Sequence, residues 1–240
     1  MSDFVEIVDV GPRDGIQSQP TLLDTDTKLA FIERLIDAGV RRIEAASFVN
    51  PKRVPQMADV DELVRRLPRR DGVRFIGLVL NRRGFERAAH SGIDQINCTT
   101  VASETFCQRN QGASVGEMYA VIADIVREAQ AGPVVGDIPL RVHFHDTRNT
   151  GVANVCAAVE AGVRIIDASC GGVGGCPFAP GATGNVATED VLYVLQRMGF
   201  ATGIDIAKII ATTKWLEGPL GTAMPAMVSR AGVFPPAVTA

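Results

Sequence analysis

Residues 5–15 read Val5-Glu6-Ile7-Val8-Asp9-Val10-Gly11-Pro12-Arg13-Asp14-Gly15. A short run rich in Val and Ile favours a buried strand, and the Gly and Pro that follow it mark a turn. Beyond the turn, apolar residues recur at helical spacing at positions 29, 32, 35 and 36, with capping oxygens at 24–26 and a glycine at 39. Strand, turn and helix in this order make one β/α unit.

The same pattern recurs along the chain. We expect strands at 42–48, 73–80, 95–101, 140–146 and 164–169, helices at 55–67, 82–91, 115–130, 150–161 and 187–198, and a last helix at 204–217. Repeated β/α units predict parallel strands with right-handed connections and ligand sites at the carboxyl ends of the strands. The predicted fold is therefore an α/β fold of the TIM-barrel (β/α) type. It is incomplete, with about six units in a single domain over 1–240 and a tail after Gly218 that wraps the surface.

Composition and net charge argue against several classes of protein. A net charge of −3 with scattered arginine pairs provides no basic surface for nucleic acid, so no nucleic-acid partner is expected. No stretch of about 18 apolar residues is present, so we expect no membrane span and a cytoplasmic location. The five cysteines are odd in number and lack metal-finger spacing, which argues against a disulfide framework.

The sharpest local motif is Val142-His143-Phe144-His145-Asp146, at the end of a predicted strand. Residues i and i+2 of a strand point to the same face, so the two imidazoles aim together. Such a pair suits a metal ion if an oxygen ligand converges from elsewhere, although an isolated pair of this kind can also be merely hydrogen-bonded within a sheet.

A candidate oxygen ligand is Asp14, in the glycine-bracketed turn directly after the first strand. A TIM barrel places its active-site loops there, and a neighbouring Arg13 could stabilise an oxyanion. Pro, Asp and Gly also make ordinary turns, so the motif alone leaves a structural interpretation open.

A third motif is the loop over 171–185, in which glycine and proline are frequent and which contains Cys176 and Asn185. Its backbone can approach a ligand closely, and an exposed Cys176 could donate a proton. A phosphate-binding loop is the alternative, but the loop lacks the Gly-Lys-Ser/Thr ending. Asn185 precedes a predicted helix, so helix capping is an equally good interpretation of that residue alone.

These motifs, in this order, resemble the hydroxymethylglutaryl-CoA lyase family of the DRE-TIM metallolyase group. The resemblance covers residues 5–15, 43–52, 54–59, 140–147 and the loop through Asp190. It implies that four residues hold a divalent cation, Mg or Mn, namely Asp14, His143, His145 and Asn185. It also implies that Arg13 stabilises an enolate, that Cys176 donates a proton and that Glu44 serves near the metal.

The implied reaction is metal-dependent cleavage of a carbon–carbon bond in a 3-hydroxyacyl-CoA, such as hydroxymethylglutaryl-CoA, to acetyl-CoA and acetoacetate. Arg148-Asn149 stands where typical members have Tyr-Gly, so citramalyl-CoA or a related acyl-CoA is a rival substrate. A condensing synthase of the same group is a further alternative, which the Gly-Gly-Cys-Pro loop fits less well.

The chain also departs from the family between Gln130 and Leu140, where members carry about two more β/α units, including an active-site Asp. A deletion, an edited sequence or an incompletely represented chain accounts for this better than a natural six-unit fold. Because these units are missing, an alternative interpretation is a relative of the family that binds the metal but lacks catalytic activity. The missing units also leave two sheet edges, and open edges favour pairing with another subunit, so a homo-oligomer is expected.

Overall fold

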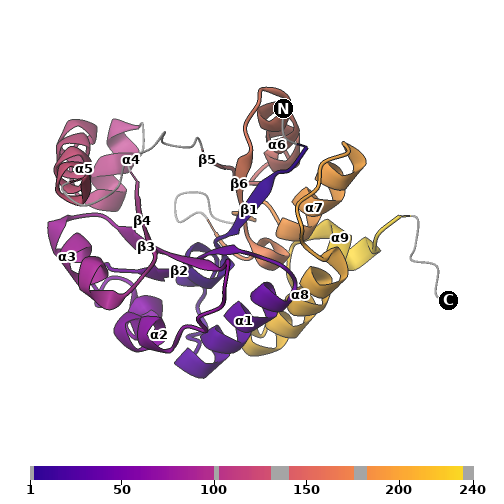
Figure 1. The fold of residues 1–240 in the computed structure, drawn as a ribbon, viewed down its shortest axis with the longest axis horizontal. Coiled ribbons are helices and arrows are strands. Elements are labelled where there is room, and N and C mark those ends of the chain that lie inside the picture. Colours follow the sequence, from indigo (N-terminus) through magenta and orange to yellow (C-terminus); the bar gives the residue numbers. More distant parts are fainter. Residues whose placement is uncertain (1–2, 100–102, 131–140, 176–182, 235–240) are drawn as a thin grey trace.

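The computed structural model describes residues 3–99, 103–130, 141–175 and 183–234 (Figure 1). Within these ranges the strands are β1 (Glu6–Asp9), β2 (Arg42–Ser47), β3 (Arg74–Val79), β4 (Gln95–Cys98), β5 (Arg141–His143) and β6 (Ile165–Ala168). They form one parallel sheet in the order β4-β3-β2-β1-β6-β5. The sheet is curled, and its two edge strands are β4 and β5.

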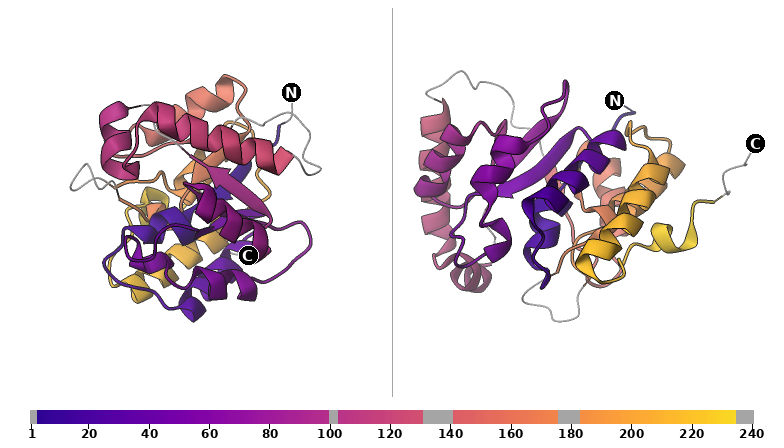
Figure 2. Two further views of the ribbon diagram at one scale, coloured as in Figure 1. Left: turned by 90° about the vertical axis from the view of Figure 1, so that its left-hand side faces the viewer. Right: turned by 90° about the horizontal axis from the view of Figure 1, so that it is seen from below.

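Helices lie on the outer side of the curled sheet, as Figures 1 and 2 show. They are α1 (Thr25–Asp37), α2 (Val60–Arg66), α3 (Arg82–Ser91), α4 (Glu104–Gln111), α5 (Val115–Gln130), α6 (Gly151–Glu160), α7 (Thr188–Arg197), α8 (Ile206–Leu220) and α9 (Met227–Ala231). Three short helical turns, η1 (Gly11–Gly15), η2 (Pro55–Met57) and η3 (Cys170–Gly172), interrupt the loops. No helix among the described residues is long and apolar enough to span a bilayer.

The prediction of an α/β fold with about six barrel units is confirmed. The first unit shows why the sequence folds in this way. Phe31, Ile32 and Leu35 of α1 are fully buried, and the Oδ1 of Asp24 accepts the Thr27 N–H at 2.7 Å, so a capped amphipathic helix packs on the sheet.

Several elements differ from the prediction. Helix α4 is polar and lacks a clear apolar stripe, so periodicity does not predict it, and α9 in the tail is likewise not predicted. The predicted strand 140–146 is shorter, because β5 ends at His143 and His145 forms an isolated antiparallel bridge with Asn185. Helix α8 runs three residues further than expected and includes Pro219 in its last turn.

Because the sheet is curled, the carboxyl ends of its strands face a common centre. Strand β2 has an irregular pairing register near its carboxyl end. The register of β2 against β3 shifts between Glu44 and Ala46, which places one extra residue in β2. A bulge of this kind re-aims side chains near functional sites. It lies beside Glu44, whose side chain is fully buried inside the curl.

Candidate metal centre

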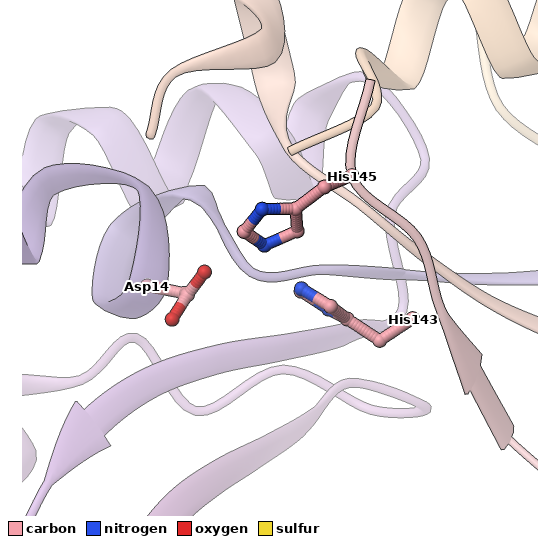
Figure 3. A group of neighbouring side chains, drawn as sticks. All are labelled: Asp14, His143 and His145. Atoms are coloured by element: carbon pink, nitrogen blue, oxygen red, sulfur yellow. The ribbon is translucent and has the colours of Figure 1, made fainter. Parts of the chain in front are cut away.

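Three side chains of types that can bind a metal ion meet at the carboxyl ends of β1 and β5. Asp14, His143 and His145 each offer a ligand atom, and these atoms all lie within 4.8 Å of one another (Figure 3). The two imidazole ring centroids are 5.1 Å apart. The structure thus brings together the two histidines of the His-x-His motif and the aspartate of the first turn, although about 130 residues separate them in the chain.

Local backbone contacts hold Asp14 in place. The turn η1 folds back on β1, with the N–H groups of Arg13 and Gly15 donating to the Val10 carbonyl at 3.2 and 3.1 Å. The Gly11 N–H donates to Asp9 Oδ1 at 2.8 Å. These contacts present Asp14 to the interior as a partly exposed carboxylate.

Each histidine is oriented by a different contact. His143 Nδ1 lies 3.2 Å from Asp167 Oδ2 on the neighbouring strand β6, an arrangement that fixes an imidazole for metal binding through its other nitrogen. His145 is held by its backbone bridge to Asn185. Asp146, next in the motif, turns away and accepts the Gly151 N–H at 2.7 Å at the start of α6.

Asn185 adjoins this cluster. Its Nδ2 donates to Asp14 Oδ2 at 3.0 Å and to the Val173 carbonyl at 3.2 Å. Its buried Oδ1 has no hydrogen-bond partner among the described residues. A carboxylate, two imidazoles and a spare amide oxygen form a ligand set that fits a divalent cation, because buried polar atoms ordinarily have partners.

A buried ion-pair network supports the cluster. Arg13 is 8% exposed and its Nη1 donates to Asp14 Oδ1 at 2.6 Å, while Nε and Nη2 contact Glu44 Oε1. Glu44 therefore does not belong to the metal-ligating group; it holds Arg13. The five N–H groups of a guanidinium exceed these contacts, so Arg13 keeps donors for a substrate oxygen.

Three further polar residues, Arg141, Asp167 and Asn97, belong to the same network and are not indicated by the sequence. Arg141 Nη2 donates to Glu44 Oε2 and to Asp167 Oδ2, both at 2.9 Å, and its Nε donates to Asp167 Oδ1. Asn97 Nδ2 donates to Glu44 Oε2 at 2.9 Å. The one available signal is spacing, since Arg141 stands two residues before His143 and so shares its face of the strand.

Electrostatics favour a charged carboxylate at the site. Burial raises the pKa of Asp14, but Arg13, the two histidines and the Asn185 hydrogen bond together hold it below its ordinary value. Burial lowers the pKa of His143, yet its hydrogen bond and attraction to Asp167 raise it overall. The pKa of His145 is lowered by burial and by His143, which keeps this imidazole neutral and available as a ligand.

The buried carboxylate of Asp9 connects the segments that surround the site. Asp9 is fully buried, and its Oδ2 accepts the Thr188 hydroxyl at 2.8 Å and the Cys170 N–H at 3.1 Å. Together with the Gly11 contact, Asp9 joins η1, η3 and the start of α7. Burial raises its pKa to about 7.

Three other residues singled out in the sequence, Cys176, Arg148 and Asn149, lie away from this cluster or outside the described residues. Cys176 falls in 176–182 and is therefore not described. Arg148 is exposed, whereas Asn149, with a φ of 55°, lines a cavity of about 200 Å³ that also borders Asn185. Arg230, directly before the end of α9, lines the same cavity, so the tail supplies a basic residue on this side of the site.

Comparisons with known proteins identify relatives over most of the chain. The HMGL-like family model matches residues 4–133 and 130–216. The chain is 36% identical to the (R)-citramalyl-CoA lyase of Chloroflexus aurantiacus, covering 99% of the chain and 98% of that protein. It is 34% identical to the hydroxymethylglutaryl-CoA lyase of Pseudomonas mevalonii, covering 91% and 93%.

A solved structure has the same fold. An HMG-CoA lyase from Acinetobacter baumannii, in complex with coenzyme A and 3-methylmalate, aligns with a TM-score of 0.90 and 30% identity over 98% of the chain and 97% of that structure. The Chloroflexus alignment extends over 310 positions, so about 70 of them have no residue in this 240-residue chain. The two blocks of the family match meet at 130–133, where the sequence predicts missing β/α units.

Proposed function

Because the chain belongs to the HMGL-like family, we propose that it is a carbon–carbon lyase that cleaves a 3-hydroxyacyl-CoA with the help of a divalent cation. One observation carries this proposal. The ligand atoms of Asp14, His143 and His145 converge within 4.8 Å, and Arg13 is ion-paired to Asp14 at 2.6 Å. A fixed cation beside a metal-ligating cluster suits a reaction that develops negative charge on a carbonyl oxygen.

Each residue of the site has a distinct role in this reaction. Asp14, His143, His145 and Asn185 would hold Mg or Mn, and the bound ion would supply Lewis-acid polarisation of substrate oxygens. As the substrate hydroxyl passes its proton to solvent water, the carbon that bears it becomes a ketone carbonyl and the adjacent carbon–carbon bond breaks. The bonding electron pair passes to the acetyl-CoA fragment as an enolate, whose oxygen Arg13 stabilises.

The remaining step is protonation of the enolate carbon, which we assign to the thiol of Cys176. Glu44 holds the Arg13 guanidinium in a fixed position, because its fully buried carboxylate contacts Nε and Nη2. The thiolate of Cys176 then regains from solvent the proton that the hydroxyl lost, so the reaction releases acetyl-CoA and a keto acid with no other reactant needed.

Two substrates fit this chemistry. Hydroxymethylglutaryl-CoA would give acetoacetate, and the lyases of that name among the relatives support it. Citramalyl-CoA would give pyruvate, and the 36% identity to a citramalyl-CoA lyase over nearly the whole chain favours it as the second candidate.

A product assay on the purified 240-residue chain separates the candidates. Each acyl-CoA is incubated with added magnesium or manganese, and with a chelator as control, while acetyl-CoA and the keto acid are quantified. Acetoacetate or pyruvate formation identifies the substrate. Absence of both products from a chain that still binds the metal would favour the catalytically disabled relative, and condensation of acetyl-CoA with a 2-oxo acid would favour the synthase.

We also propose a cytoplasmic homo-oligomer of this single domain. The described cysteines Cys98, Cys156 and Cys170 form no disulfide, as is usual in a reducing compartment. The edge strands β4 and β5 each pair on one side only within the described sheet. Light scattering of the purified protein gives the number of subunits, and a monomeric mass would contradict the oligomer.

A further inference from the structure

We propose that Arg141 is a positioning residue that spans the interior of the curled sheet and holds the metal-binding histidine in place. The inference deepens the proposed cation-dependent lyase and rests on it for its effect on turnover. Arg141 lies on β5, an edge strand, yet its guanidinium reaches Glu44 on β2, three strands away in the sheet order. Such a contact is made across the interior of the curl rather than along the sheet.

The geometry gives Arg141 two partners at once. Nε and Nη2 face the two carboxylate oxygens of Asp167, and Nη2 also donates to Glu44 Oε2 at 2.9 Å. A planar guanidinium matches a carboxylate in this two-point manner, which a lysine cannot reproduce. Arg141 therefore fixes both the position and the rotation of the Asp167 carboxylate.

Through these partners Arg141 acts on two groups of the site. Asp167 Oδ2 lies 3.2 Å from His143 Nδ1 and so sets the direction of that imidazole. Glu44 uses its other oxygen to hold Arg13. Three carboxylates, those of Asp14, Glu44 and Asp167, face two arginines, Arg13 and Arg141. Removal of Arg141 increases this excess of acidic charge and leaves Glu44 and Asp167 without the guanidinium that bridges them.

A matched control exists at the other end of the sheet. Arg42 also joins three strands, donating to Glu6 Oε2 at 2.8 Å and to Gln95 Oε1 at 3.0 and 3.2 Å. Its side chain is 18% exposed, as is that of Arg141. The contacts of Arg42 lie at the amino ends of the strands, away from the metal-ligating group.

The test compares Arg141→Met, Arg141→Lys and Arg42→Met. Manganese affinity is measured by electron paramagnetic resonance of the free ion, and kcat and KM are measured with the substrate that the product assay identifies. We expect Arg141→Met to weaken manganese binding roughly 10- to 100-fold, the usual effect of losing a partner behind a metal ligand, and to lower kcat with little change in KM. Arg141→Lys should recover part of both losses, and Arg42→Met should bind manganese as the parent does.

The proposal is overturned if Arg141→Met binds manganese and turns over like the parent protein, or if Arg42→Met shows the same losses. If Arg141→Met does not fold, Arg141→Lys and Arg42→Lys are compared at a temperature where circular dichroism shows both folded. Equal manganese affinity in that pair would also overturn it. Manganese binding is read without any substrate, so the role of Arg141 is decided even if the lyase activity is absent.

Discussion

At the residue scale, the candidate site combines short motifs with contacts made only by the fold. Local turn and strand patterns in the sequence indicate Asp14, His143 and His145, whereas Asn185 becomes a candidate ligand only through the family resemblance. The structure brings these four together. Their role as ligands stays a prediction until a metal titration is done.

Other members of the network could not be predicted in this way. Asp167 lies in an apolar strand, and its importance comes from the parallel pairing that places it opposite His143. Asn97 and Arg141 meet Glu44 only because the sheet curls. Long-range geometry of this kind leaves no pattern in a single sequence.

A substitution at Cys176 tests the proton-donor role. Cys176→Ala removes the thiol but none of the proposed metal ligands, so we expect turnover to fall at least about 100-fold, within the range typical of general acid catalysis, with manganese affinity unchanged. Cys156→Ala, in helix α6, is the matched control. Full activity in Cys176→Ala would remove this residue from the mechanism.

At the element scale, the turn η1 and the loop after β6 are fitted to each other. A Cβ placed on Gly15 would lie 2.6 Å from Val173 Cγ1 and 2.9 Å from the Val173 carbonyl oxygen. Since real Cβ atoms do not approach backbone so closely, Gly15 permits the contact between the turn that carries Asp14 and the segment that leads to Asn185.

Substitution of this glycine should therefore separate the two ligand-bearing segments. We expect Gly15→Ala to weaken manganese binding by about tenfold or more, the scale of losing a metal-supporting contact, as measured by calorimetric titration. Gly116→Ala in α5, where a Cβ meets nothing within 4 Å, should leave binding unchanged. Parent-like affinity in Gly15→Ala would show that the contact does not position the site.

Asp9 connects three site elements and gives them a dependence on pH. Its pKa rises from an ordinary 3.8 to about 7 in the fold because of burial. A carboxyl group with a raised folded-state pKa stabilises the fold fully below about pH 4, and this contribution is lost as the pH rises toward 7.

Asp9→Asn cannot ionise and should lack this dependence. We expect the free energy of unfolding of the parent, measured against that of Asp9→Asn by urea denaturation, to fall between about pH 4 and 7, by at most about 1.4 kcal/mol per pH unit. The difference should level off above that range. Exposed Glu33, replaced by Gln, serves as the control. Parallel curves for the parent and Asp9→Asn would contradict the assignment.

Helices and strands differ in how well the sequence predicts them. Elements with clear apolar periodicity or capping residues, such as α1 and α3, lie close to their predicted positions. Two of the exceptions are α4, which is mostly polar, and β5, which ends early because its continuation pairs with the loop at Asn185 rather than with a strand.

At the scale of the whole molecule, the six parallel strands found among the described residues form an incomplete barrel that still has a candidate site at the carboxyl ends of its strands. The number of units can be counted from the alternation of strands and helices. The curl of the sheet, and the use of Arg141 to span it, cannot be predicted in this way, since both depend on how distant strands pack.

We propose that this 240-residue chain carries a cation-dependent lyase site. The most direct measurement is acetyl-CoA release from hydroxymethylglutaryl-CoA and citramalyl-CoA by metal-stripped protein, before and after manganese is restored. We expect no release from the stripped protein and renewed release of acetyl-CoA from one of the two substrates after manganese is added. Release that is unaffected by stripping, or no release from manganese-loaded protein, would contradict the account.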